Sequence, residues 1–425
     1  MGKKLNFIVL SILVLIAVFY SSSYGELSAS LNSGDTAWML VASAFVLLMT
    51  PGLSFFYGGM INKKNIISTM LQSFVALGVV SVVWVIVGFS LAFGDSFYGI
   101  IGNPMTYFNF KNVGVNPNPD FAETIPFLLF ALFQLKFAII TPALITGSMA
   151  GRIRFRSYIL FMVLFSIFIY SPLAHMTWHP DGLFRNWGVL DFAGGTVVHM
   201  SAGFAALAGA IYLGKRKHAL EHNANVPYVI LGTGLLWFGW FGFNAGSALG
   251  ANADAVIAFA NTNIASATAM IAWIFYERLR GRKMSAVGAC IGAVVGLVAI
   301  TPAAGFVNIG QSMFIGFVAS IISNWAISLK NRSSIDDTLD VFPSHGIGGI
   351  VGMMLTAVFA ANVGLIYGET TTFLYHLLAL VITGVYTFGL SFVLLKVVDV
   401  LLKMRVRADQ EERGLDVSQH GEQIN

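Results

Sequence analysis

The chain has 425 residues, of which 56% are hydrophobic and only 10% are charged, and its net charge is +4. With a mean hydropathy of +0.77, it cannot be a soluble globule, because about a quarter of the residues of such domains are charged. It also lacks the basic clusters among aromatics that nucleic-acid binding needs. The single cysteine, Cys290, excludes intrachain disulfides, iron–sulfur clusters and thiolate zinc sites.

The first twenty-five residues differ from the rest of the chain. Lys3 and Lys4 precede a short apolar run that ends at Tyr20, and Ser23-Tyr24-Gly25 offers small residues for cleavage. This pattern predicts a secretory signal peptide over residues 1–25, with a retained first helix as the alternative.

Eleven further stretches are long and apolar enough to cross a bilayer, which needs about 20 residues per helix. They lie near residues 36–60, 65–94, 122–150, 155–176, 193–214, 226–249, 255–277, 284–301, 308–329, 343–363 and 371–402. We therefore predict an all-α membrane protein with eleven transmembrane helices in a membrane domain over 26–404. The remaining tail, 405–425, is too short for a fused kinase or nucleotide-binding domain.

The basic residues fall almost entirely on one side of these spans. With the mature N-terminus outside, eighteen of the 24 lysines and arginines lie in inner loops or the tail, and only Lys111 and Arg185 lie in outer loops. Because cytoplasmic loops are enriched in basic residues, the sequence predicts an outside N-terminus and an inside C-terminus in the cell (inner) membrane.

Two Asp–His pairs recur at one spacing. Asp191 precedes His199 by eight residues at the fifth span, and Asp337 precedes His345 by eight residues at the tenth. Ionisable groups are costly in a bilayer and are therefore functional candidates. Two tandem copies of a five-helix repeat must lie in opposite orientations. We expect an inverted 5+5 helix repeat plus a final peripheral helix, with the two histidines facing each other near the membrane centre.

The same residues also have structural interpretations. A buried histidine can simply hydrogen-bond a neighbouring helix. Asp191 follows an outer loop and suits an N-terminal cap of the fifth span, a role favoured here over substrate contact. Lys136, in the third span, can extend along its own stem to an interface. Phe133 and Phe137 taken alone fit core filler or lipid contact equally well.

Three longer motifs connect these residues to a known family. DFAGGTVVHMSAGFAALAGAIYLGKR at 191–216, PGLSFFYGGMINKKN at 51–65 and GLDVSQHGE at 414–422 resemble the motifs of the ammonium transporter (Amt) and Rhesus family, in particular its bacterial Amt branch. The resemblance covers essentially the whole mature chain. It implies ammonium or ammonia as substrate, with methylammonium as an analogue, and no cofactor or metal. It also implies a homotrimer with one pore per subunit and a PII-type signal protein as a candidate cytoplasmic partner.

The resemblance assigns roles to four residues along the pore. His199, in VVHMSAG, and His345, in SHGIGG, match the paired pore histidines of the family. Phe137, in FQLKFAIIT, and Phe243, in GWFGFNAGS, match two stacked rings that close the outer pore entrance.

Further residues match positions on either side of this gate. Trp178, in HMTWHP, and Ser247 match the family's outer recruitment site for the ammonium ion, to which Phe137 also belongs, and Phe133 matches a ring that flanks it. Asp191 is similar to a structural or ion-stabilising aspartate of the family. The positions that match the inner pore lining are Trp240, Phe56, Tyr57 and Val341.

Two positions depart from the family pattern. Gly151 stands where the family often has a glutamate, which puts a cytoplasmic contact with the tail in doubt. Lys136 is adjacent to Phe137, and we expect it to face away from the pore because an ammonium group in a cation site would repel the substrate.

The expected chemistry follows from these residue types. Aromatic rings and a hydroxyl attract ammonium without a formal charge, and an apolar path beyond them penalises a bare ion. Ammonium can lose its proton to a histidine and cross as ammonia, whereas potassium cannot. The alternatives are a sensor of the same fold that signals to a separate partner with little flux, and a membrane enzyme or haem protein that uses the two histidines.

Overall fold

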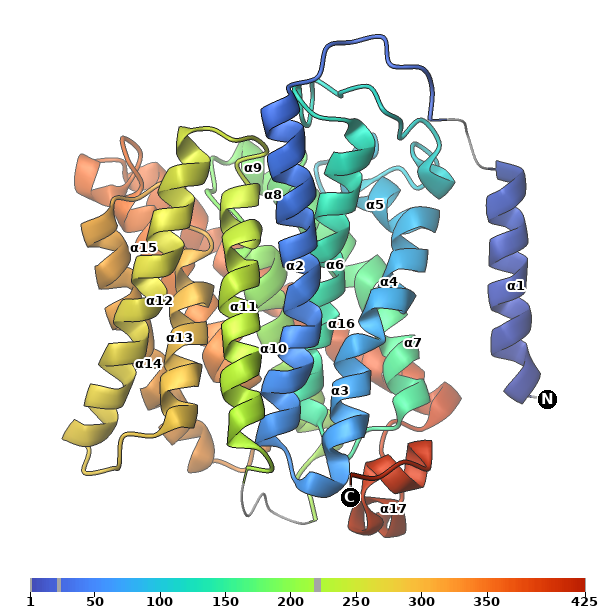
Figure 1. Cartoon of the computed structure of the whole chain (residues 1–425), viewed down its shortest axis with the longest axis vertical. Coiled ribbons are helices and arrows are strands. Elements are labelled where there is room, and N and C mark those ends of the chain that lie inside the picture. Colours follow the sequence, from blue (N-terminus) through green and yellow to red (C-terminus); the bar gives the residue numbers. More distant parts are fainter. Residues whose placement is uncertain (1, 21–23, 218–222, 425) are drawn as a thin grey trace.

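The computed structural model describes residues 2–20, 24–217 and 223–424. Its helices run up and down between two ends of one bundle, and the tail folds against one of these ends (Figure 1). We call this end the C-terminal face and the other end the opposite face. Among the described residues the one sheet is a short hairpin of β1 (Ser96–Phe97) and β2 (Ile101–Gly102).

Ten helical segments among the described residues are long and apolar enough to cross a membrane. Six are single helices: α2 (Ser33–Met60), α6 (Phe127–Met149), α11 (Val226–Gly246), α12 (Ala253–Leu279), α14 (Ile309–Asn331) and α16 (Thr370–Leu402). The expectation of a helical multi-pass membrane protein is thereby confirmed.

The other four segments consist of consecutive shorter helices. The second predicted span consists of η1 (Lys63–Asn65), α3 (Ile66–Phe74), α4 (Ala76–Val83), η2 (Trp84–Gly88) and α5 (Phe89–Phe93). The fourth consists of α7 (Phe155–Phe165), η4 (Ser166–Tyr170), α8 (Ser171–Trp178) and α9 (Leu183–Asn186). The fifth joins η5 (Gly195–Met200) to α10 (Ser201–Leu213), and the tenth joins η6 (Phe342–Ile347) to α15 (Gly348–Phe359). Short helices η3 (Phe108–Phe110) and η7 (Leu365–Tyr367) lie in connecting loops.

The eighth predicted span is shorter than the others. It is α13 (Ala286–Ile300), a helix of 15 residues at the expected position, and it does not reach the length of the ten long segments. At the N-terminus, α1 (Gly2–Tyr20) stands at the edge of the bundle (Figure 1). The Asn109 amide donates to the Ala17 carbonyl at 3.1 Å. The expected cleavage position at Ser23 lies outside the described residues, and signal-peptide removal stays a prediction.

Side-chain caps begin four of the long helices and the shorter α13. Each cap accepts the backbone N–H of the residue three positions further on, at 2.9 to 3.1 Å. These caps satisfy N–H groups that have no partner within the helix. The capping residues are Asn32 for α2, Asn225 for α11, Asn252 for α12, Ser285 for α13 and Asn308 for α14.

The C-terminal tail is docked on the C-terminal face. Its helices are α17 (Ala408–Arg413) and η8 (Asp416–His420). The Asp416 carboxylate accepts the backbone N–H groups of Ile67 and Ser68 at 3.0 and 2.7 Å, and so caps α3. The Asn65 side chain accepts the Leu415 N–H at 2.8 Å. Burial raises the pKa of Asp416, although both N–H groups oppose this shift. The tail is thus an ordered part of the folded chain.

Candidate functional site

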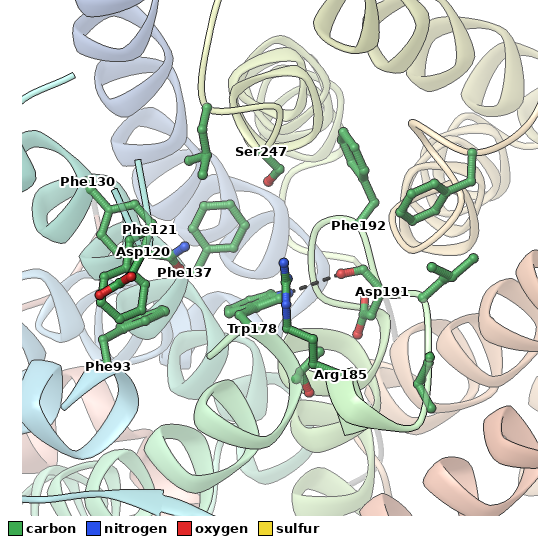
Figure 2. A pocket seen from close by; sticks show the side chains of 17 residues that line it. Phe93, Asp120, Phe121, Phe130, Phe137, Trp178, Arg185, Asp191, Phe192 and Ser247 are labelled. Atoms are coloured by element: carbon green, nitrogen blue, oxygen red, sulfur yellow. Dashed lines mark hydrogen bonds between the residues drawn. The ribbon is translucent and has the colours of Figure 1, made fainter. Parts of the chain in front are cut away.

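A cavity of about 490 Å³ on the opposite face contains most of the predicted recruitment site (Figure 2). We call it the vestibule. Trp178, Phe137 and Ser247 line it, and Asp191 lies on its wall. The indole N–H of Trp178 donates to the Asp191 carbonyl at 3.1 Å, which holds the ring in place. Ser247 Oγ donates to the Phe243 carbonyl at 2.8 Å, so its lone pairs stay available as acceptors.

Two stacked phenylalanine rings separate the vestibule from the interior. The centroids of Phe137 and Phe243 lie 4.1 Å apart with the planes inclined by 29°. Trp178 meets Phe137 edge-on at 5.9 Å. Phe137 lines the vestibule, whereas Phe243 lines a second cavity beyond it. Phe133, expected to flank the recruitment site, does not line the vestibule and packs against Phe137 at 5.0 Å instead.

The second cavity contains both predicted histidines. Its volume is about 10 Å³, close to the smallest space that holds a water-sized molecule. His199 Nδ1 and His345 Nδ1 lie 3.3 Å apart, within hydrogen-bonding reach. Both side chains are buried. We call this cavity the histidine chamber. Apart from the two imidazoles and the Trp240 indole, its lining is apolar: Met49, Leu53, Phe56, Ile140, Leu144, Val198, Leu236, Phe243 and Val294.

Asp191 positions the first histidine through the backbone. One carboxylate oxygen accepts the N–H groups of Gly194 and Gly195 at 2.8 and 2.6 Å, and the other accepts the N–H and hydroxyl of Thr196 at 2.7 and 2.5 Å. These bonds cap η5, a π-helical turn that contains His199. Asp191 therefore makes the cap that its sequence position favours, and both carboxylate oxygens are occupied.

Asp337 occupies a corresponding place before the second histidine. Its carboxylate accepts the Phe342 N–H at 2.7 Å at the start of η6, the π-helical turn that contains His345. Lys330 donates to its backbone carbonyl at 3.0 Å and pairs with Asp340. Burial and the neighbouring Asp340 carboxylate raise the pKa of Asp337 to about 6. Both aspartates thus accept a backbone N–H at the start of a histidine-bearing turn, although the Asp191 carboxylate accepts four hydrogen bonds there and that of Asp337 accepts one.

The segments that carry the two histidines cross where glycines face each other. A Cβ atom placed on Gly203 would lie 2.3 Å from the Gly346 Cα atom, so no larger residue fits at this position without movement. Small residues allow helix backbones to approach closely. This close crossing brings η5 and η6 together and puts the imidazoles in contact.

Thr301 is a residue of the histidine network that the sequence analysis missed. Its hydroxyl donates to the Leu297 carbonyl at 2.8 Å and accepts the Trp240 indole N–H at 2.9 Å. His199 Nε2 lies 3.3 Å from the same oxygen. Thr301 follows α13, where only a survey of uncharged polar residues near the apolar spans could have found it.

The four residues predicted to line the inner pore lie in two separate places. Phe56 and Trp240 line the histidine chamber. Tyr57 and Val341 lie outside it and meet around Gly147, where an added Cβ would lie 2.8 Å from the Tyr57 ring and 2.7 Å from a Val341 methyl group. The Tyr57 hydroxyl donates to the Leu144 carbonyl at 2.9 Å. These two side chains therefore pack beside α6 and do not line the chamber.

The vestibule also contains polar residues that the sequence analysis did not select. Gln134 Oε1 and Thr177 Oγ1 are buried atoms with no hydrogen-bond partner among the described residues. Arg185 points into the same cavity near Trp178 (Figure 2). Gln134 and Thr177 are uncharged and so escaped a search restricted to ionisable groups.

The two departures from the family pattern have clear structural settings. Lys136 is half-buried on α6 and lines neither cavity. Gly151 has a φ of +80°, a conformation that favours glycine, and a Cβ there would lie 3.1 Å from the amide nitrogen of Asn65. Asn65 is the residue that binds the tail at Leu415, so Gly151 lies beside a tail contact.

Among the described residues no three histidine, cysteine or carboxylate side chains gather as a metal site would require. The profile of the Ammonium Transporter Family matches residues 37–424. The chain belongs to the ammonium transporter family. The match covers both cavities, both histidine-bearing segments and the docked tail, which agrees with the resemblance of the sequence motifs to this family.

Several ammonium transporters and related structures resemble this chain along their full length. The "Ammonium transporter" of Aquifex aeolicus is 49% identical over 96% of this chain and 97% of its own. That of Bacillus subtilis is 43% identical over 92% and 98%. Saccharomyces cerevisiae Mep2 superposes with a TM-score of 0.86 at 35% identity, over 95% of each chain. A structure titled "Sensor Amt Protein" superposes with a TM-score of 0.85 at 30% identity, over 91% of this chain and 98% of its own.

Proposed function

We propose that this chain is an ammonium transporter that recruits ammonium in the vestibule, removes its proton and conducts ammonia through the histidine chamber. The observation that carries the proposal is the sequence of environments along one path. An aromatic cavity leads to the stacked rings of Phe137 and Phe243, and beyond them lies an apolar chamber whose two buried histidines touch each other.

Recruitment rests on aromatic faces and one acceptor. Trp178 and Phe137 each supply cation–π attraction of about 0.5 to 2 kcal/mol. Ser247 offers the lone pairs left free by its own donation to Phe243. Ammonium donates a directional hydrogen bond to such an oxygen and potassium cannot. These contacts bind weakly, which suits a site that must also release its ion.

Selectivity rests mainly on the chamber. A bare ion in an apolar, nearly closed cavity loses its hydration without replacement, at a high cost in free energy. Ammonium avoids this cost by giving up a proton, after which ammonia crosses as a neutral molecule. Potassium has no such route, and so the chamber acts as the filter.

The hydrogen bonds around Thr301 indicate which nitrogen can take the proton. The Thr301 proton goes to Leu297, the shorter contact, so His199 Nε2 must donate to Thr301 Oγ1. His199 Nδ1 then accepts from His345 Nδ1. His345 Nε2 is then the imidazole nitrogen that keeps an unused lone pair, and no partner for it is found among the described residues. We assign this nitrogen as the proton acceptor.

The arrangement in the membrane is part of the same proposal. The Asp191 cap lies in the vestibule and the Asp337 cap lies among basic residues of the C-terminal face, which supports an inverted 5+5 repeat with a final peripheral α16. We propose eleven crossings, with α13 as the short one, and a cytoplasmic C-terminal face in the inner membrane. Signal-peptide removal, the homotrimer and a PII-type partner belong to this proposal through the family resemblance.

A sensor with little flux is the second candidate. It is supported by the structural similarity to a protein titled as a sensor Amt. Uptake of radiolabelled methylammonium into vesicles that contain the purified protein distinguishes the two functions. We expect uptake well above that of protein-free vesicles, and uptake equal to protein-free vesicles would favour the sensor.

A further inference from the structure

A third cavity, of about 550 Å³, lies at the C-terminal face, away from the vestibule and the histidine chamber. Three segments that are far apart in the chain build it: the start of α7, the end of α16 and the tail. We call it the basic cavity. Its lining residues are Arg154, Phe155, Arg156, Ser157, Leu401, Leu402, Lys403, Arg407, Gln410, Ser418 and Gln419.

The charge of this cavity has one sign. Four of the lining residues are basic and none is acidic. Arg407 is paired with Asp409, and Arg154 donates to the Arg405 carbonyl. Arg156 is exposed, and no carboxylate pairs with it among the described residues. The Lys403 side chain is 70% exposed, and its Nζ atom lies 3.7 Å from a carboxylate oxygen of Asp399, a long distance for an ion pair. The cavity therefore offers positive charge to an anion from outside.

The apolar surroundings of the cavity distinguish between anions. Leu401 and Leu402, which line it, are 63% and 41% exposed, and Val400 beside them is 81% exposed. The exposed apolar surface continues along α16 through Val397 and Val393. A ligand that covers both features has an anionic head and hydrocarbon chains. Basic residues next to a membrane-spanning helix attract anionic lipids in this way.

We propose that the basic cavity binds the phosphodiester head group of an anionic phospholipid, with Arg156 and Lys403 as its charged contacts and the acyl chains along α16.

Binding of this lipid is coupled to docking of the tail, because the tail supplies one wall of the cavity. Gln419 anchors that wall: its side-chain oxygen accepts the Phe155 N–H at 2.8 Å and its amide donates to the Ile153 carbonyl at 3.2 Å. When the tail leaves, Arg407 and Gln410 leave the cavity with it. The cavity that receives the lipid is therefore complete only while the tail is docked.

The test measures lipid binding to the purified full-length protein by native mass spectrometry. We expect phosphatidylglycerol to bind the wild-type protein more tightly than phosphatidylcholine, and increasingly weakly as salt is added. The variant R156Q/K403Q removes both free charges. At about fivefold per basic residue near an anionic lipid surface, its affinity for phosphatidylglycerol should fall about 25-fold. The matched control R282Q/K283Q removes two exposed basic residues from the α12–α13 turn and should bind like the wild type.

Three results would overturn the proposal. The first is an unchanged affinity of R156Q/K403Q for phosphatidylglycerol, and the second is an equal affinity of the wild type for both lipids. The third is displacement of phosphatidylglycerol by an equal concentration of glycerol 3-phosphate, which would indicate a soluble phosphate ligand. If R156Q/K403Q does not fold, the variant R156K/K403R keeps both charges and the single variant K403Q removes one. The first should bind like the wild type and the second about fivefold more weakly.

Discussion

At the scale of single residues, Thr301 connects the Trp240 indole to the His199 imidazole. Its one oxygen accepts the indole N–H of Trp240 and lies within reach of His199 Nε2. It thereby determines which nitrogen of His199 carries the proton, and through the contact between the Nδ1 atoms it determines the tautomer of His345. In the proposed mechanism a single uncharged hydroxyl group thus controls which nitrogen of the chamber accepts the proton.

Replacement of Thr301 by valine tests this control. Valine keeps the shape but leaves two buried donors without an acceptor, at a cost of about 1 to 3 kcal/mol, so we expect methylammonium uptake to fall roughly tenfold. Thr301→Ser keeps the hydroxyl and should restore most of the uptake. Uptake of Thr301→Val at the wild-type level would contradict the tautomer assignment.

Replacement of Trp178 tests the recruitment of the substrate separately from the exclusion of potassium. Trp178→Leu removes one cation–π contact of about 0.5 to 2 kcal/mol, which corresponds to a two- to thirtyfold rise in the methylammonium concentration at half-maximal uptake. Trp325→Leu is the control, because Trp325 is exposed on α14 and lines neither cavity. A potassium flux through Trp178→Leu would show that the vestibule, not the chamber, is the filter.

At the scale of elements, each histidine lies in a π-helical turn that an aspartate caps. The eight-residue spacing before each histidine favours an internal repeat, and the sequence predicts a capping role for Asp191 but not for Asp337. In each cap a carboxylate accepts one or more of the first N–H groups of a turn. This contact depends on a backbone geometry that the spacing of residues in the sequence does not specify. Residue type alone does not separate Phe133 from Phe137, since both are aromatic residues on one helix. The family motif separates them, because it assigns Phe137 to the stacked pair and Phe133 to a flanking ring.

The buried Asp337 gives the tenth span a characteristic pH dependence. Its pKa is about 6 in the folded protein, above the usual value near 3.9 in an unfolded chain, so the folded state binds the proton more tightly. This contribution to stability is complete below about pH 4 and is lost as pH rises through 6, by at most about 3 kcal/mol.

Asp337→Asn keeps an acceptor for Phe342 N–H and does not titrate. As pH increases from 4 to 7, the melting temperature of the wild type in detergent should therefore fall relative to that of the variant. A difference that stays constant over this range would show that Asp337 does not titrate as described.

At the scale of the whole molecule, the distribution of basic residues predicts the orientation. The residues predicted to lie inside include Arg152, Arg216 and Arg405, and these three converge with the docked tail on the C-terminal face. Most helix positions followed from hydropathy alone. For α13 hydropathy predicts the position but not the length, because a helix of 15 residues continued by an apolar turn resembles a longer one in the sequence.

Cysteine labelling tests the orientation. In a protein whose buried Cys290 is replaced by alanine, cysteines at exposed Lys111 and Gln423 should react with a membrane-impermeant reagent from opposite sides. Lys111→Cys should label from outside intact cells, and Gln423→Cys only after the membrane is opened. Labelling of both from one side would contradict the proposed topology.

The central claim is that an apolar chamber with two coupled histidines excludes potassium, and one measurement tests it directly. Proteoliposomes that contain the wild-type protein or His199→Asp/His345→Glu are adsorbed on a solid-supported membrane and exposed to a potassium jump. Methylammonium uptake serves as proof that both proteins are folded and active. We predict no potassium current through the wild type and a clear current through the acidic variant, because carboxylates give a bare ion a polar path. A potassium current through the wild type, or none through an active acidic variant, would contradict the account.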